Sequence, residues 1–147
     1  MSIPLIDTNI LVYVFDKSEK EKHSACANLL DRCWLEGEKY AVSVQNLSEF
    51  YHITTQKIQK PLKKEFAEKI VKRIIEFDNF RVINFDENTV LSAIEINKKY
   101  NIHYFDALLA ATMRESGIFK IYTEDSDFKK VPWLEVVDPI VENLNEI

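Results

Sequence analysis

The chain has 147 residues, of which 46% are hydrophobic, and a formal net charge of −5. This length and apolar content fit one globular domain over residues 1–147, with a core large enough to fold without disulfides or a structural metal. No apolar stretch approaches the roughly 20 residues of a transmembrane helix, and the N-terminus lacks the basic segment of a signal peptide. We therefore expect a cytoplasmic protein with no membrane partner.

Short apolar runs alternate with helical patterns along the chain. Runs typical of strands cover residues 3–6, 40–43, 81–84, 119–122 and 134–137. Helical patterns cover residues 8–15, 20–36, 45–57, 62–77, 87–100 and 104–116. Alternation of this kind predicts an α/β fold, with a mainly parallel sheet of about five strands and helices on both faces.

Three punctuating residues support the ends of these helices. Pro61 precedes the fourth helix, Asp86 can cap the fifth, and Gly117 stands where a glycine would end the sixth. Cys26 and Cys33 lie seven residues apart on the second helix, so their Cα atoms would be about 10 Å apart, beyond the reach of a disulfide. We expect both to be buried, reduced thiols.

Four acidic residues border these elements where a parallel sheet would bring them together. Asp7 ends the first strand, Asp125 follows the fourth, Glu49 lies on the third helix, and Asp106 opens the sixth. Carboxylates within a few ångströms repel one another unless a divalent cation such as Mg²⁺ or Mn²⁺ neutralises them. The set therefore predicts a metal site at the carboxyl edge of the sheet.

Each acid also has a purely structural interpretation. Asp7 could be only an N-cap, Glu49 an exposed helical residue, and Asp125 with its neighbour Asp127 an acidic surface turn. Asp106 is harder to explain in this way, because the helix after it is apolar on every side and no lysine or arginine lies within a helical turn. The arrival of four acids at one edge favours the metal site.

In this order, the motifs resemble the PIN-domain family, and in particular its small VapC-like ribonuclease toxins. The resemblance is carried by Asp7-Thr8-Asn9, by Ser43 with Glu49, by the run Asp106–Ala111, and by Thr123-Glu124-Asp125. It implies a three-layer α/β/α fold and a metal-dependent endoribonuclease whose four acids hold one or two Mg²⁺ or Mn²⁺ ions. RNA would be hydrolysed to 5′-phosphate and 3′-hydroxyl ends. A homodimer and a cognate antitoxin protein are implied as well.

Other polar residues could support the acids. Asn9, Ser43 and Thr123 are suited to orienting a carboxylate or a water bound to the metal, although each could equally be a turn or capping residue. Asp127 is an alternative to Asp125 and could share or replace its role. The sequence leaves these alternatives open.

The net charge argues against a nucleic-acid partner, but the four site acids account for most of the negative excess. A basic segment could bind phosphate or be only a solvated helix face; it contains Lys57, Lys60, Lys63, Lys64, Lys69, Lys72 and Arg73. Three aromatic residues could stack on unpaired bases or belong to the core: Tyr51, Tyr104 and Phe105.

Competing function classes fit less well. A phosphatase of the haloacid dehalogenase type needs Asp-x-Asp after its first strand, and position 9 is Asn; a receiver domain needs an acidic pair that Asp7 lacks. A di-iron bundle needs two Glu-x-x-His motifs, and the chain has one, Glu49 with His52. The remaining alternative is a non-catalytic PIN-like module that binds RNA or protein, against which the presence of all four acids argues.

Overall fold

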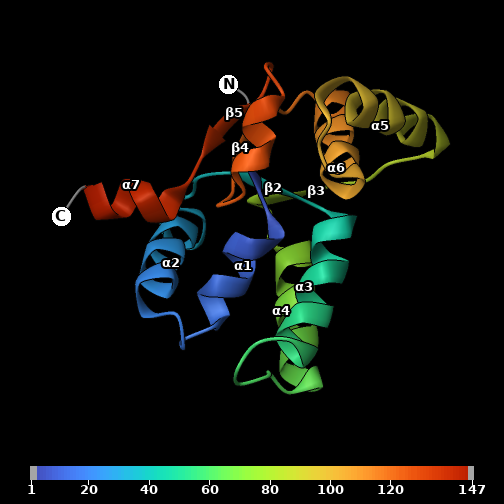
Figure 1. Ribbon diagram of the computed structural model, residues 1–147. Helices are drawn as coiled ribbons and strands as arrows, with labels where there is room; N and C mark the ends of the chain where they lie inside the picture. The colour runs from blue at the N-terminus through green and yellow to red at the C-terminus, as the bar shows by residue number, and fades with distance from the viewer. Residues whose placement is uncertain (1–2, 146–147) are drawn as a thin grey trace.

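The computed structural model describes residues 3–145, and in this range five strands form one sheet. The strands are β1 (Leu5–Ile6), β2 (Tyr40–Ser43), β3 (Phe80–Ile83), β4 (Lys120–Tyr122) and β5 (Glu135–Val137). Their order is β3-β2-β1-β4-β5, and every neighbouring pair is parallel. The predicted parallel sheet of five strands is confirmed (Figure 1).

Helices fill the connections between the strands. They are α1 (Thr8–Phe15), α2 (Lys20–Trp34), α3 (Val44–Gln56), α4 (Lys64–Glu76), α5 (Glu87–Tyr100), α6 (Tyr104–Glu115) and α7 (Pro139–Asn145), with a 3₁₀ helix η1 at Ser126–Lys130. The six predicted helices are all present, with ends displaced by two residues at most; α7 and η1 were not predicted. Within the described range, no helix is both long and apolar enough to span a bilayer.

The predicted helix ends are confirmed in two of three cases. Asp86 caps α5 by accepting hydrogen bonds from the N–H groups of Asn88 and Thr89. Gly117 follows α6 with a φ of +72°, the left-handed conformation that glycine adopts without strain. Pro61, by contrast, does not begin a helix, because α4 starts at Lys64.

Side chains of the sheet alternate between two cores, as the pleat requires. Leu5 and Ile121 face the helical hairpin of α5 and α6, whereas Ile6 and Tyr122 face α1, α2 and α3. Figure 1 shows α5 and α6 on one side of the sheet and α1 to α4 on the other. The fold therefore has the predicted three layers.

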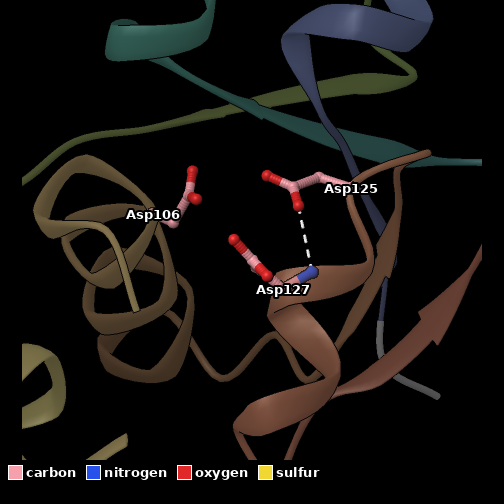
Figure 2. Close-up of side chains that lie close together, drawn as sticks. All are labelled: Asp106, Asp125 and Asp127. Carbon is pink, nitrogen blue, oxygen red and sulfur yellow. Dashed lines mark hydrogen bonds between the residues drawn. The ribbon is translucent and has the colours of Figure 1, made fainter. Parts of the chain in front are cut away.

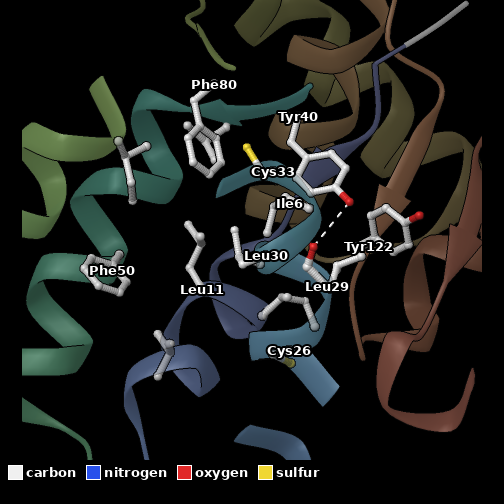
Figure 3. Packing of buried hydrophobic residues seen from close by; sticks show 14 of the residues in the cluster. Ile6, Leu11, Cys26, Leu29, Leu30, Cys33, Tyr40, Phe50, Phe80 and Tyr122 are labelled. Carbon is white, nitrogen blue, oxygen red and sulfur yellow. Dashed lines mark hydrogen bonds between the residues drawn. The ribbon is translucent and has the colours of Figure 1, made fainter. Parts of the chain in front are cut away.

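Figure 3 shows the core on the α1 and α2 side of the sheet. Leu11, Leu30 and Tyr40 are almost completely buried there, and Cys26 and Cys33 lie among them as free thiols. Burial raises the pKa of both thiols, so they stay protonated at neutral pH. The expectation of buried, reduced cysteines is confirmed.

The strand order reverses beside β1, which determines where a site can form. From β1 the chain moves outward through β2 to β3, then returns through α5 and α6 to place β4 on the other side of β1. Asn101 ends α5 in the left-handed conformation, with φ at 53°, and α6 starts three residues later. Because α6 leads into β4, it begins at the carboxyl edge of the sheet. The crevice between β1 and β4 at that edge is the usual place for a ligand in such folds.

Candidate active site

Asp7 lies at the strand-order reversal, directly after β1 and at the N-cap of α1. Its Oδ1 accepts a hydrogen bond of 2.8 Å from Thr8 N, and its Oδ2 accepts one of 2.8 Å from Thr123 Oγ. Its pKa is raised to about 6, chiefly by burial and also by the charges of Glu49 and Asp125, against the lowering effect of the two hydrogen bonds. Asp7 is therefore both a helix cap and a member of an acidic cluster.

Three further carboxylates gather next to it, from α6 and from the start of η1. One oxygen each from Asp106, Asp125 and Asp127 lies within 4.8 Å of the others. Figure 2 shows the three side chains pointing toward a common space, with Asp127 N donating a hydrogen bond of 2.9 Å to Asp125 Oδ1. Burial, together with the negative charges of Asp125 and Asp7, raises the pKa of Asp106 to about 7. The negative charge of the cluster therefore exceeds the positive charge near it.

Glu49 reaches the same groove from α3. Its carboxylate accepts a hydrogen bond of 3.3 Å from Thr8 Oγ, and burial raises its pKa. Together with Asp7, Asp106 and Asp125, it lines one groove of about 560 Å³. Glu49 thus faces the groove, although it lies outside the tight group of three.

Asp125 and Asp127 are placed differently, a point that the sequence left open. Asp125 lines the groove, and its charge acts on both Asp7 and Asp106. The side chain of Asp127 is 50% exposed and lies 3.7 Å from Lys130 Nζ. Glu124, between Thr123 and Asp125, points away from the acids and pairs with Lys22 at 3.4 Å.

Three neutral residues were expected to support the acids. One bonds directly to an acid, and the other two reach the acids only through a further residue. Thr123 bonds directly to Asp7, and its oxygen accepts hydrogen bonds from Asn9 Nδ2 at 3.2 Å and from Asp125 N at 3.0 Å. Asn9 thus acts through Thr123. Ser43 contacts none of the four acids: it caps α3 and bonds to Asn46, which in turn reaches Asp7 and Thr8.

Asn46 and Thr8 are site residues that the sequence reasoning missed. A signal was present, because Ser43-x-x-Asn46 has the spacing of a capping box and Thr8 lies inside the Asp-Thr-Asn motif. Capping spacing alone, however, does not say that the second member reaches across to another helix.

The donor set suits a hard divalent cation. All candidate ligand atoms are carboxylate oxygens, which Mg²⁺ and Mn²⁺ prefer. Burial, with a further contribution from mutual repulsion, raises the pKa values of Asp7 and Asp106, and a bound cation would stabilise both carboxylates in their ionised form. Asp7, Asp106 and Asp125, with Glu49 beside them, could hold such an ion directly or through water.

Comparison with known proteins identifies the family to which this chain belongs. A family model described as the PIN domain matches residues 5–134. The chain belongs to the PIN-domain family. Ribonuclease VapC2 of Methanocaldococcus jannaschii is 30% identical over 138 residues, which are 90% of this chain and 91% of that protein. Ribonuclease VapC6 of the same organism is 37% identical over 73 residues, 50% of this chain and 47% of that protein, so this match spans only about half of either.

Among solved structures, a toxin-antitoxin complex from Klebsiella pneumoniae contains a chain with the same fold. It superposes with a TM-score of 0.61 at 23% identity, and the match covers 92% of this chain and 97% of the other. Membership in the PIN-domain family excludes the di-iron bundle and the other folds weighed above.

Beyond the acids, the groove of this PIN domain has an apolar wall and one basic residue. Val12, Ile53 and Ile58 line it, and Lys57 is the one cation among its described lining residues. The rest of the basic segment does not assemble there: Lys64 and Lys72 line a separate groove between α3 and α4. The basic segment therefore does not form a single basic face around the acids.

The aromatic candidates are also divided. Phe105 is 55% exposed and lines the acidic groove of the PIN domain, next to Asp106. Tyr51 faces the separate groove between α3 and α4, and Tyr104 packs against the core on the α5 and α6 side of the sheet. Of the three, Phe105 is positioned to meet a ligand of the acids.

A second polar cluster holds the segment after β4. Tyr13 donates a hydrogen bond to Glu124, and Lys22 contacts both the Tyr13 hydroxyl, at 3.2 Å, and the Glu124 carboxylate. Burial, followed by the neighbouring Glu124, raises the pKa of Tyr13 to about 12, so the phenol remains a donor. Because Glu124 is held on this side, Asp125 is turned toward the groove.

Proposed function

We propose that this chain is a divalent-metal-dependent endoribonuclease and the toxin of a toxin-antitoxin pair. The observation that carries the proposal is the groove in which Asp7, Glu49, Asp106 and Asp125 come together at the reversal of strand order. The names of the two relatives, both VapC ribonucleases, support the choice of RNA as substrate. We take residues 1–147 to form one nuclease unit.

In this proposal the four acids hold Mg²⁺ or Mn²⁺ and leave room for a phosphate oxygen. A divalent ion there would lower the pKa of a bound water and offset negative charge on the phosphate and the leaving oxygen. Thr123 and Thr8 N keep Asp7 in place through bonds of 2.8 Å, and Asp127 N does the same for Asp125. Attack by water with departure of the 3′ oxygen leaves 5′-phosphate and 3′-hydroxyl ends.

The groove suits a single strand of RNA. Phe105 exposes a face beside Asp106 on which an unpaired base can stack, and Lys57 at the C-terminal end of α3 can meet a neighbouring phosphate. Glu49 and Lys57 are eight residues apart on that helix, or about 12 Å. A strand in the groove would thus meet the acids first and the lysine a short distance along.

Partners follow from the same proposal. An antitoxin that inserts an arginine among the unneutralised carboxylates would form a charge-assisted clamp and block the metal. The Klebsiella pneumoniae structure with a chain of similar fold is a toxin-antitoxin complex. A homodimer is part of the proposal too, and light scattering of the purified protein would test it.

The deciding experiment is cleavage of a mixed pool of structured RNAs with Mg²⁺, Mn²⁺ or excess EDTA. We expect cuts with 5′-phosphate ends for the wild type with metal, none with EDTA, and none for Asp7→Asn or Asp106→Asn. Asp31→Asn, an exposed acid on α2 that does not line the groove, is the matched control. RNA binding without cleavage under any metal would instead favour a non-catalytic PIN module.

A further inference from the structure

Asn46 is a buried polar residue next to the acids whose side-chain amide takes part in several hydrogen bonds. It lies in the first turn of α3, is 0% exposed, and its amide group bonds to Ser43, Thr8 and Asp7. It faces the same side of α3 as Glu49, three residues later. A buried amide with partners on two other elements has a role beyond its own helix.

The orientation of this amide is determined by a backbone group. Ser43 N–H can only donate, and it lies 3.1 Å from Asn46 Oδ1, so the oxygen must face Ser43. Ser43 Oγ accepts from Asn46 N at 2.9 Å and therefore gives its own proton to the same Oδ1. The amide nitrogen is consequently turned toward the acids.

That nitrogen serves two carboxylates at once. It donates to Thr8 Oγ at 2.8 Å and to Asp7 Oδ1 at 3.4 Å. Because Thr8 Oγ accepts from Asn46, its own proton is free to go to Glu49 Oε1, 3.3 Å away. One amide thus controls Asp7 directly and Glu49 through a hydroxyl.

We propose that Asn46 is a positioning residue that sets the geometry of Asp7 and Glu49 for binding a divalent cation, an inference that rests on the proposed metal dependence. Capping α3 needs only the oxygen side of the amide. The nitrogen side adds nothing to the cap, and its two protons go to the groups that line the acidic groove.

Ser43→Ala and Asn46→Ala separate positioning from capping, because each breaks the same reciprocal cap. In Ser43→Ala the backbone N–H of residue 43 still holds the Asn46 oxygen, so the amide keeps its direction. We expect similar losses of melting temperature in the two variants. Calorimetric titration with Mn²⁺ should show about 10- to 100-fold weaker binding for Asn46→Ala and near-normal binding for Ser43→Ala.

Equal Mn²⁺ affinity in wild type and folded Asn46→Ala, or equal weakening in both variants, would overturn the inference. If circular dichroism shows that Asn46→Ala does not fold, Thr8→Val decides, because it removes the hydroxyl between Asn46 and Glu49. Weaker Mn²⁺ binding is expected. Unchanged affinity would overturn the proposed positioning of Glu49 by Asn46, and so the joint positioning of the two acids. Failure of the wild type to bind Mn²⁺ would overturn the proposed function, and this inference with it.

Discussion

Thr123 donates a hydrogen bond of 2.8 Å to Asp7, although 116 positions separate the two residues along the chain. The same hydroxyl accepts bonds from Asn9 and from the backbone of Asp125. One side chain therefore uses its single proton and both lone pairs to join the segments that follow β1 and β4. The hydrogen bond between Thr123 and Asp7 thus lies at the junction of these two segments, within the candidate site.

Thr123→Val tests that junction. The change keeps the shape of the side chain but leaves the Asn9 amide and the Asp125 N–H without their acceptor, so we expect a loss of about 1–3 kcal/mol in the free energy of unfolding. Urea denaturation at pH 7 would measure it. Thr123→Ser keeps the hydroxyl and should lose much less; equal stability of the valine and serine variants would contradict the assignment.

The stability of the metal-free protein should fall as pH rises from about 4 to about 7. The pKa values of Asp7 and Asp106, about 6 and about 7 in the folded protein, exceed the ordinary value of 3.8. The folded state therefore binds more protons than the unfolded chain in this window, and its stability, complete below pH 4, is lost as the two groups ionise. Urea unfolding in EDTA at several pH values would measure the slope.

Asp106→Asn should flatten this pH dependence. The neutral amide removes one repelling charge, and after allowance for partial solvent exposure we expect a gain on the order of 1 kcal/mol at pH 7.5 without metal. Excess Mg²⁺ should stabilise the wild type and have little effect on the variant. Asp31→Asn, on the exposed side of α2, serves as control; an identical pH slope in all three proteins would contradict the prediction.

Lys57→Ala should weaken RNA binding in a salt-dependent way. If Lys57 meets one phosphate, its loss should reduce the slope of log affinity against log salt by about 0.7, the value for one contact on a single strand. Binding of a single-stranded oligonucleotide by the uncleaving Asp106→Asn protein would measure this. Lys63→Ala is the matched control, and an equal change in both variants would mean that the groove lysine has no special role.

Tyr13→Phe should loosen the segment that carries Asp125. The change removes the hydroxyl that bonds to Glu124 and Lys22, so backbone amides of residues 123–127 should exchange hydrogen faster. Global stability should fall by less than about 1 kcal/mol, because the Lys22 and Glu124 side chains remain partly exposed. Tyr51→Phe is the control, and unchanged exchange would show that the segment is held by other contacts.

Helices and strands were predicted correctly where apolar residues recur at a regular spacing along the chain. The elements from β2 to α6 carry regular apolar spacing and start and stop signals, so their ends were found within two residues. α7 was missed although Asp138 precedes Pro139 and caps the following N–H of Ile140, which is a recognisable helix start. η1 has no such period, because five residues are too few to show one.

The order of the four acids relative to strands and helices was readable from the sequence, because in a parallel sheet a residue that follows a strand must lie at the carboxyl edge. The directions of individual side chains were not. Glu124 and Asp125 are adjacent and chemically alike, yet contacts with Tyr13 and Lys22, over 100 positions away, turn one aside and leave the other in the groove.

The sequence by itself thus determined the fold class, the family and the candidate acids, because these depend on local spacing and on the edge at which each strand ends. Only the tertiary structure decided that Asn46 bonds to Asp7 and, through Thr8, connects to Glu49. It also decided that Lys57 rather than Lys64 lines the acidic groove, and that Phe105 is the one aromatic candidate there. Such contacts join elements distant in the chain, and their geometry follows from packing that no local pattern encodes.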